Sequence, residues 1–349
     1  MKVIRADKKI IIWILLLAAI SCSKDDSIAN NNEVFTQQLP GVIYFHFAGK
    51  YGYVNFKENK YVHEFATKSD FGGFDVSLHG KNILIISGKG FAGTDRQRMI
   101  YRPVNSFSTK TDIAEGSIFN FVYQWNDIAL GGTVTRSYIS PNEAFIAVNA
   151  SSSAKHPIAL IHAGKDETIE TFRDENISLR DHSIMRWTAD NSLWVNVGGS
   201  IFKINESNNW EPISMLQIPG THATVNAQGT KIVFRHNKHL YMCNTNGSDL
   251  RQITKSRTNS SLPYDGERLP EFSPDGKYIA FGSQGTGAAH SWENPIDGSV
   301  VGTASNFGYL TVIPADGKLY DVDNANSGVI FPLNSQNKLI AVDGQYVWR

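Results

Sequence analysis

Pro270-Glu271-Phe272-Ser273-Pro274-Asp275-Gly276-Lys277-Tyr278-Ile279-Ala280-Phe281 is the stretch that decides the fold. It predicts a short strand, a tight turn over residues 273–276 and a second, apolar strand. Proline presets the first turn dihedral, aspartate hydrogen-bonds to its own backbone, and glycine accepts a positive φ angle. The stretch therefore predicts an antiparallel hairpin.

Degenerate copies of this turn, each leading into an apolar strand, recur along the chain. They lie within residues 78–85, 140–148, 188–195, 226–234 and 334–341. No segment shows the 3.6-residue hydrophobic period of an amphipathic helix. The sequence therefore predicts an all-β protein built from a repeated unit.

The unit is most complete over residues 240–281. A strand, an Asn246-Gly247 turn and an outer strand ending in Leu-x-x-Ile-Thr add a second hairpin to the first. This stretch resembles the TolB-like, WD40-like β-propeller repeat. The resemblance implies four-stranded blades around a central channel, with the first strand of each blade lining the channel and the loop before it reaching the channel mouth.

The number of blades follows from the spacing of the turns. The positions equivalent to Gly276 in the repeated turn are separated by 63, 48, 38, 47 and 61 residues, against about 40 to 45 for a standard blade; they are Gly80, Glu143, Asn191, Gly229, Gly276 and Asn337. We expect insertions at residues 116–132 and 285–306. Residues 42–47 predict an earlier blade without the turn, which makes seven blades, with six as the alternative count.

Both chain ends are expected to close the propeller. The C-terminal residues 346–349 read as a strand, and residues 33–37 would supply the missing outer strand of the same blade. Such closure removes exposed sheet edges. The sequence thus predicts one propeller over residues 41–349.

The N-terminus has the layout of an export signal. Four basic residues and the apolar run of residues 10–20 precede Cys22, and the run is too short for a transmembrane helix of about 20 residues. Residues 19–22 resemble the lipobox of bacterial lipoproteins, which implies that residues 1–21 are a signal peptide and that Cys22 carries lipid. An ordinary secretory signal is the alternative.

Residues 22–40 are polar and aperiodic, as expected of a flexible tether. Within them, residues 23–26 resemble the acidic surface-export signal of lipoproteins from Bacteroidota-type bacteria. This resemblance implies a lipid-anchored protein of the outer membrane that faces the medium. A solvated linker is the other interpretation.

Composition narrows the functional classes. The 349 residues include 33 lysines and arginines and 33 aspartates and glutamates; without residues 1–21 the balance is 29 to 32, a net charge of about −3. A nucleic-acid partner is therefore not expected, because binding phosphates requires a basic surface. Cys243, the other of two cysteines, is expected to be buried on a strand, so no disulfide or cysteine-zinc site is predicted.

Charged and imidazole groups are expected where the first strands begin. These candidate ligand-binding residues at the channel mouth are Arg136, Asp181, His182, Arg186, His222, Glu267 and Arg268. Together they could hold an anionic sugar, a peptide end or a metal; the alternative is solvated loop residues or bridges between blades. His290, Trp292 and Glu293, in the second insertion, form a candidate loop contact for a sugar or a protein.

The sequence predicts binding or scaffolding rather than catalysis. It contains no G-x-S-x-G nucleophile motif and no helical H-x-x-x-H metal motif, and no catalytic residue, metal or cofactor is predicted. The expected partners are the outer membrane, through the lipid, and a carbohydrate or protein. Two alternatives stay open: a polysaccharide lyase or hydrolase using histidines and acids at the channel mouth, and a periplasmic partner in envelope assembly.

Overall fold

The structure is a computed structural model of the chain. It describes residues 39–47, 50–58, 60–67, 71–87, 98–103, 119–121, 134–150, 158–163, 168–172, 182–258, 266–283, 291–293, 300–302, 308–324, 327–334, 338–342 and 346–349.

Strands dominate the described residues, as predicted, and the 3-10 turn η3 (Glu206–Asn208) is the one helical element assigned among them. They form six four-stranded antiparallel sheets. In the order of hydrogen-bonded neighbours, the sheets are β4 (Phe71–Val76), β5 (Asn82–Ser87), β6 (Arg98–Pro103), β7 (Phe119–Phe121); β8 (Val134–Ile139), β9 (Phe145–Ala150), β10 (Ile158–His162), β11 (Thr168–Phe172); β12 (His182–Trp187), β13 (Leu193–Val197), β14 (Ser200–Ile204), β15 (Ile213–Gln217); β16 (Thr221–Val225), β17 (Lys231–His236), β18 (His239–Asn244), β19 (Arg251–Gln252); β21 (Arg268–Phe272), β22 (Tyr278–Ser283), β25 (Gly308–Pro314), β27 (Ala341–Val342); and β28 (Tyr346–Trp348), β1 (Val42–Phe47), β2 (Lys50–Asn55), β3 (Lys60–Thr67).

Two smaller pairings complete the described strands. Strands β20 (Thr254–Lys255) and β26 (Tyr320–Asp321) run parallel, whereas β23 (Ser291–Glu293) and β24 (Val300–Gly302) run antiparallel. The second pair lies in the insertion expected at residues 285–306, and β7 lies in the one expected at 116–132. The remaining parts of both insertions lie outside the described residues.

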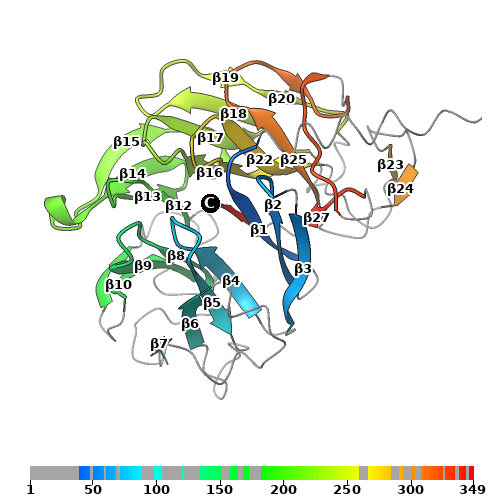
Figure 1. Cartoon of the computed structure of the whole chain (residues 1–349). Helices are drawn as coiled ribbons and strands as arrows, with labels where there is room; N and C mark the ends of the chain where they lie inside the picture. The colour runs from blue at the N-terminus through cyan, green and yellow to red at the C-terminus, as the bar shows by residue number, and fades with distance from the viewer. Residues whose placement is uncertain are drawn as a thin grey trace, which may run out of the picture.

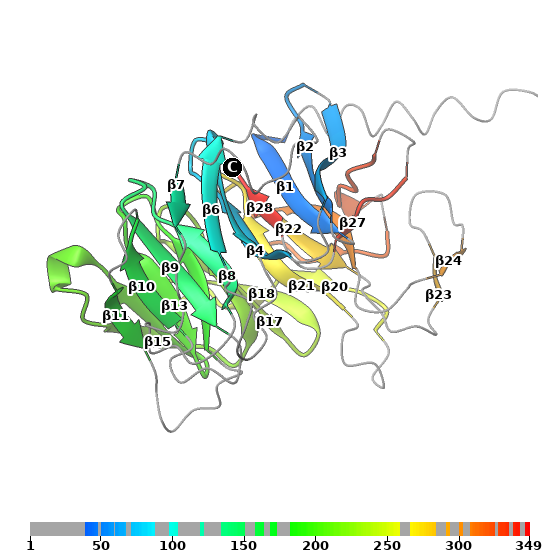
Figure 2. The same ribbon diagram turned by 90° about the horizontal axis from the view of Figure 1, so that it is seen from below.

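The sheets are arranged in a ring around the C-terminal strand, which is red in Figure 1, and Figure 2 shows the same arrangement from below. Hydrophobic clusters fill the spaces between neighbouring sheets, and each fully buried large side chain contributes about 1.5 to 3 kcal/mol. Examples, going round the ring from the closing sheet, are Tyr44 with Phe74, Phe145 with Trp187, Trp194 with Phe234, Met242 with Phe272, and Leu310 with Trp348.

The predicted turns are present between the first and second strands of five sheets. Gly80, Glu143, Asn191, Gly229 and Gly276 have φ angles of 57 to 71°, and the N–H of each donates to the carbonyl three residues earlier. The prediction of a turn at these five positions is thus confirmed. The sixth expected position, Asn337, lies outside the described residues.

The two ends of the described chain meet in one sheet. Strand β28 pairs with β1, and Val42 N–H donates to the carbonyl of Arg349 at 2.6 Å. Gly41 permits this approach, because a Cβ atom there would lie 2.1 Å from the Arg349 carbonyl oxygen. The predicted count of seven blades is not confirmed, and residues 33–37, expected to close the ring, lie outside the described residues.

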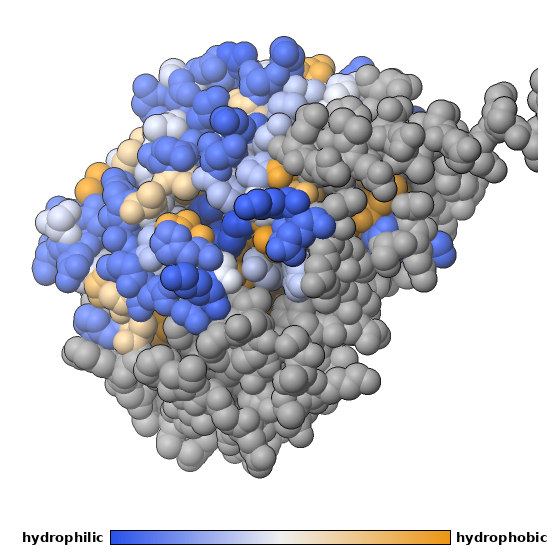
Figure 3. All heavy atoms as spheres, in the orientation of Figure 1, coloured by the Kyte–Doolittle hydropathy of each residue, from blue (hydrophilic) through white to orange (hydrophobic). Residues whose placement is uncertain are grey.

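The face seen in Figure 3 is largely hydrophilic over the described residues, with hydrophobic residues scattered singly. Among the large hydrophobic side chains described, Ile213, Leu250 and Leu319 are exposed. Cys243 is buried on β18 as predicted, and burial raises its thiol pKa. Within the described residues, no helix is both long and apolar enough to cross a membrane.

Candidate functional site: a polar cavity on the axis

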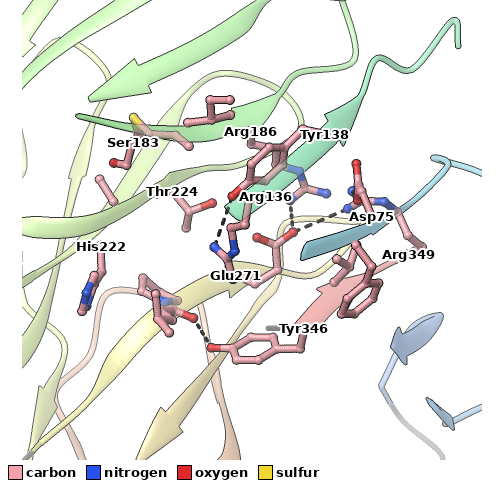
Figure 4. A pocket seen from close by; sticks show the side chains of 17 residues that line it. Asp75, Arg136, Tyr138, Ser183, Arg186, His222, Thr224, Glu271, Tyr346 and Arg349 are labelled. Atoms are coloured by element: carbon pink, nitrogen blue, oxygen red, sulfur yellow. Dashed lines mark hydrogen bonds and ion pairs between the residues drawn. The ribbon is translucent and has the colours of Figure 1, made fainter. Parts of the chain in front are cut away.

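A cavity of about 100 Å³ lies where the six inner strands converge. Each of β4, β8, β12, β16, β21 and β28 contributes to its lining, which Figure 4 shows from close by. At about 30 Å³ for each water molecule in the liquid, the cavity has room for roughly three water molecules. The first strands therefore line a central space, as the resemblance implied.

In each sheet that carries the turn, one residue of the inner strand points into this cavity. It lies two positions before the first residue of the turn, where the inner strand pairs with the second strand. In the five sheets that carry the turn, these residues are Asp75, Tyr138, Arg186, Thr224 and Glu271. The inner strands of these five sheets also have a register irregularity, which lies directly before this position in four of them and two residues before it in β8, a feature that redirects side chains.

A buried ion-pair network holds the acidic side of the cavity. Arg349 Nη2 lies 2.7 Å from Asp75 Oδ1, and Arg349 Nη1 lies 3.5 Å from Glu271 Oε1. Arg186 Nη1 lies 3.5 Å from the same Glu271 oxygen. Arg349 thus bridges two carboxylates from different sheets, and Figure 4 shows the two arginines converging on Glu271.

Further hydrogen bonds fix these charged groups. The Asp75 carboxylate accepts from the N–H groups of Val76 and Ile139, both at 2.8 Å, and so links two neighbouring sheets. Burial raises the pKa of Asp75, while Arg349 and these N–H groups oppose the rise. Burial lowers the pKa of Arg186, and Glu271 opposes that change.

Arg136 and two tyrosines complete the charged part of the lining. Arg136 Nη1 donates to the Tyr138 hydroxyl at 3.1 Å, and the Tyr346 hydroxyl donates to the Leu269 carbonyl. Burial raises the pKa of both tyrosines, so they stay protonated. For Arg136, burial acts to lower the pKa, but Tyr138 and Glu271 outweigh it and the value is raised.

Strand β16 contributes polar atoms of a different kind. Thr224 is 2% exposed, and its Oγ1 has no hydrogen-bond partner among the described residues. The same holds for Nδ1 of His222, two residues earlier. Burial lowers the pKa of His222 to about 4, and the positive charges of Arg235, Arg136 and Arg268 act in the same direction. The imidazole is therefore neutral at pH 7.

Backbone strain is concentrated at the same end of the cavity. His222 and Leu269, both in the lining, have φ angles of 50° and 53°. Side chains other than glycine rarely take this conformation, which costs about 1 to 3 kcal/mol and tends to occur at functional sites. The strained residues lie on β16 and β21, next to the unpartnered polar atoms.

The central space is narrower at the end where the turns lie. A second cavity of about 20 Å³ lies there, lined on the turn side by Leu78, Pro141, Ala189 and Ala227. Asp75, Tyr138, Arg186 and Arg349 line both cavities and so form the floor between them.

Three of the predicted site residues come together in the cavity: Arg136, Arg186 and His222. Glu267 and Arg268 do not line it. Glu267 is buried instead against His239 Nδ1 at 2.9 Å and Thr254 Oγ1 at 2.8 Å, and Arg268 is 7% exposed at the start of β21. The Glu267 N–H donates to the Lys238 carbonyl at 2.9 Å, which ties the start of β21 to the turn between β17 and β18.

The other predicted residues are not tested in detail. His182 begins β12, while Trp292 and Glu293 lie in β23, and their side chains are not among those described. Cys22, Asp181 and His290 lie outside the described residues. Within the residues described, no group of three or more histidine, cysteine, aspartate or glutamate side chains has the geometry of a metal site.

Sequence reasoning missed Asp75, Tyr138, Thr224, Glu271, Tyr346 and Arg349. The first four share one signal, because each lies two residues before the first residue of a turn that the sequence had already revealed. Tyr346 and Arg349 carry no such signal: they belong to the closing sheet, in which the inner strand comes from the far end of the chain.

Comparison with known proteins agrees with this geometry. No family model and no curated protein matches the chain. Among solved structures, TolB from Acinetobacter baumannii matches with a TM-score of 0.51 and 16% identity over 79% of this chain and 62% of that chain. The chain has a β-propeller fold. A propeller domain of Cps50 (Swd1) from Myceliophteria thermophila matches less well, with a TM-score of 0.42 and 12% identity over 77% of this chain and 88% of that one. The propeller here spans less than two thirds of the A. baumannii protein's length, and identities this low establish the fold alone.

Proposed function

We propose that this propeller is a ligand-binding protein, and that its axial cavity takes a small soluble molecule or the end of a partner molecule. The observation that carries the proposal is a pair of buried polar atoms without a hydrogen-bond partner among the described residues, Thr224 Oγ1 and His222 Nδ1, in a cavity lined by all six inner strands. Leaving a buried polar atom unpaired costs about 1 to 3 kcal/mol. A bound ligand that hydrogen-bonds to them would recover this free energy.

The ion pairs and the pKa values of the ionisable groups in the lining favour binding without catalysis. Both carboxylates of the described lining, Asp75 and Glu271, are paired with arginines. His222, with a pKa of about 4, is a weak base at neutral pH. General acid–base catalysis is most efficient when the pKa of the group lies near the working pH. These groups are therefore suited to holding a ligand in place.

The cellular part of the proposal rests on the N-terminal sequence. We propose that Cys22 is lipidated after removal of residues 1–21, and that the tether of residues 22–40 places the propeller on the outer membrane, facing the medium. We also propose that the six four-stranded sheets are the blades of one closed ring, and that β28 and β1 share the closing blade. A ring of this kind would keep the cavity rigid.

Binding can be tested on the full chain with a library of neutral sugars, amino acids, amines and organic acids, using the thermal midpoint as the readout. At least one class should raise the midpoint. Ser183→Tyr, which puts a phenol into the described lining, should abolish that rise. Ser200→Tyr, at a partly exposed position on β14, is the matched control and should leave it unchanged. If no compound shifts the midpoint, the binding proposal is wrong.

Anchoring needs a separate test. Cells expressing the full chain are fed a clickable palmitate analogue, and labelling is compared with the Cys22→Ser variant. Label is expected on the first protein alone, and protease treatment of intact cells should remove the propeller. Absence of label would refute lipidation, whereas label with full protease resistance would place the protein on the periplasmic side.

A further inference from the structure

We propose that one end of the propeller rests on the lipid surface to which the chain is anchored, with Ile213, Leu250 and Leu319 as its lipid contacts. This is the turn end, where the turns between the first and second strands lie. The inference goes beyond ligand binding, and it rests on the proposed lipid anchor because the anchor supplies the membrane. It turns the narrow end of the central space toward the lipid.

The three residues are the large hydrophobic side chains of the described chain that are exposed, at 40%, 55% and 53%. Ile213 begins β15 and Leu250 directly precedes β19, and these are the outer strands of two successive sheets. Leu319 directly precedes β26, which follows β25 of the next sheet. Each part of the ring thus contributes one exposed aliphatic side chain at its outer rim.

Ile213 lies at the turn end of β15. It pairs with Lys203 on β14, and Lys203 Nζ lies 2.9 Å from Asp190 Oδ2 in the turn before β13. At the other end of the same strand, Gln217 pairs with Ser200. Strand β15 therefore has an exposed aliphatic residue at the turn end and an exposed polar residue at the opposite end.

Leu250 and Leu319 lie at the turn end as well. Leu250 follows the turn between β18 and β19, where Thr245 Oγ1 donates to the Gly229 carbonyl at 3.1 Å. Leu319 follows the turn after β25, where the first residue past the strand donates its N–H to the Lys277 carbonyl at 2.7 Å. Both acceptors lie at turns between first and second strands. Single exposed hydrophobic residues need no explanation, but three at one end of neighbouring sheets indicate a contact surface.

The charges beside these residues are paired, so the contact depends on apolar area. Each exposed aliphatic residue has an ion pair next to it in the chain or on the neighbouring strand. The pairs are Lys203 with Asp190, Asp249 with Arg251, and Lys318 with Asp316. Opposite charges in contact largely cancel each other's field in salt solution. A lipid surface without net charge therefore fits this end of the molecule.

The chain enters the propeller at the same end. A Cβ atom on Gly41 would lie 3.4 Å from Pro274 Cγ, in the turn between β21 and β22. Sixteen residues lie between Cys22 and Leu39. A flexible tether of that length spans about 20 to 24 Å, which is close to the length of a six-residue strand at about 20 Å. A lipid on Cys22 therefore holds the turn end closer to the membrane than the opposite end.

The test places an environment-sensitive fluorophore at either end of β15. The full-length protein, isolated from membranes, is labelled at Ile213→Cys or, as the matched control, at Gln217→Cys; the protein without an introduced cysteine is the blank, and Cys243 is buried. In phosphatidylcholine vesicles, a lipid with a spin-labelled headgroup should quench the fluorophore at residue 213 and leave the one at residue 217 unquenched, because about 13 Å of strand separates them.

Substitutions at the other two contacts make the assignment specific. Leu250→Ser combined with Leu319→Ser should lower the ratio of lipid-bound to free orientations, read from the quenching at residue 213, about twentyfold, since each half-exposed leucine contributes about fivefold. Gln217→Ser should leave the quenching unchanged. Added salt should also leave it unchanged, whereas strong salt dependence would contradict a contact made by apolar side chains.

The outcomes separate this inference from the anchor. Equal quenching at both ends of β15, no quenching in a protein whose Cys22 carries lipid, or no effect of the double serine variant would overturn the inference and leave the anchor standing. A blue shift at residue 213 before vesicles are added would show that a second copy covers this end, and would also overturn it. If Cys22 takes up no palmitate, the probes are read on the full chain with Cys22→Ser added to vesicles; quenching at residue 213 alone would then support the contact surface and refute only the anchor.

Discussion

Two buried threonines with opposite surroundings provide a direct test of how this propeller is stabilised. Thr224 is 2% exposed and its hydroxyl has no partner among the described residues. Thr254 is 0% exposed, and its hydroxyl accepts from Leu240 N–H and donates to Glu267 Oε2, both at 2.8 Å. Valine has nearly the shape and the χ1 restriction of threonine, so the substitution changes hydrogen bonding and little else.

Thr224→Val should stabilise the protein without ligand by about 1 kcal/mol, because it removes a buried hydroxyl that lost its water and gained no protein partner. Thr254→Val should destabilise it by about 3 kcal/mol. That variant leaves the Leu240 N–H without its acceptor and removes a hydrogen bond to a carboxylate, which is worth about 1.5 to 3 kcal/mol.

The two variants should therefore differ by about 4 kcal/mol in the free energy of unfolding. Urea denaturation, followed by tryptophan fluorescence at constant ionic strength and without organic acids, measures both values. Unchanged m-values would show that the comparison concerns the native state. A destabilisation of Thr224→Val by more than about 1 kcal/mol would mean that its hydroxyl is satisfied, and the proposal that a ligand completes its hydrogen bonds would then lose its basis.

Three further comparisons of variants test other parts of the structure. His222 has a pKa of about 4 in the folded protein against 6.5 ordinarily, so the unfolded chain binds the proton more tightly; the stability of wild type relative to His222→Asn should fall by about 3 kcal/mol as the pH drops from 7 to 4, measured by urea denaturation at each pH. Asp75→Asn should cost about 3 to 5 kcal/mol, since it breaks a buried ion pair, whereas Lys203→Gln, at a more exposed pair, should cost less than about 1 kcal/mol in the same assay; equal costs would contradict the network. Gly41→Ala should lower the thermal midpoint far more than Gly80→Ala, because a Cβ atom would lie 2.1 Å from a backbone oxygen at the first site and 3.4 Å from the nearest atom at the second, while both positions have positive φ.

The repeated hairpin could be predicted because its signal is local. Turn residues and the apolar strand that follows lie within about a dozen residues of one another, and the φ angles at Gly80, Glu143, Asn191, Gly229 and Gly276 follow from that local chemistry. The number of blades was harder to predict from the sequence, because it depends on pairings between segments that are far apart in the chain. Strand β28 pairs with β1 across almost the whole chain, and no local pattern announces such a partner.

The residues of the candidate site also divide into those that the sequence could predict and those that depend on the tertiary fold. Arg136, Arg186 and His222 were predicted because charged residues near the first strands could be recognised one by one. Glu267 looked similar in the sequence, yet it is buried against His239 and Thr254. Its direction depends on how the chain enters β21, and this is a property of the tertiary fold.

The chemistry of the five equivalent inward positions supports the proposed ligand site beside β16. The turn fixes their backbone but not their side chains, which are Asp75, Tyr138, Arg186, Thr224 and Glu271. Four of these find partners in the cavity lining: Asp75 with Arg349, Glu271 with Arg186 and Arg349, and Tyr138 with Arg136. Among these five described residues, Thr224 alone has a polar atom left unsatisfied, and the neighbouring unsatisfied atom of His222 lies on the same strand. A folded protein tolerates this loss of free energy more readily if something else completes the bonds, so the proposed function places the ligand against β16.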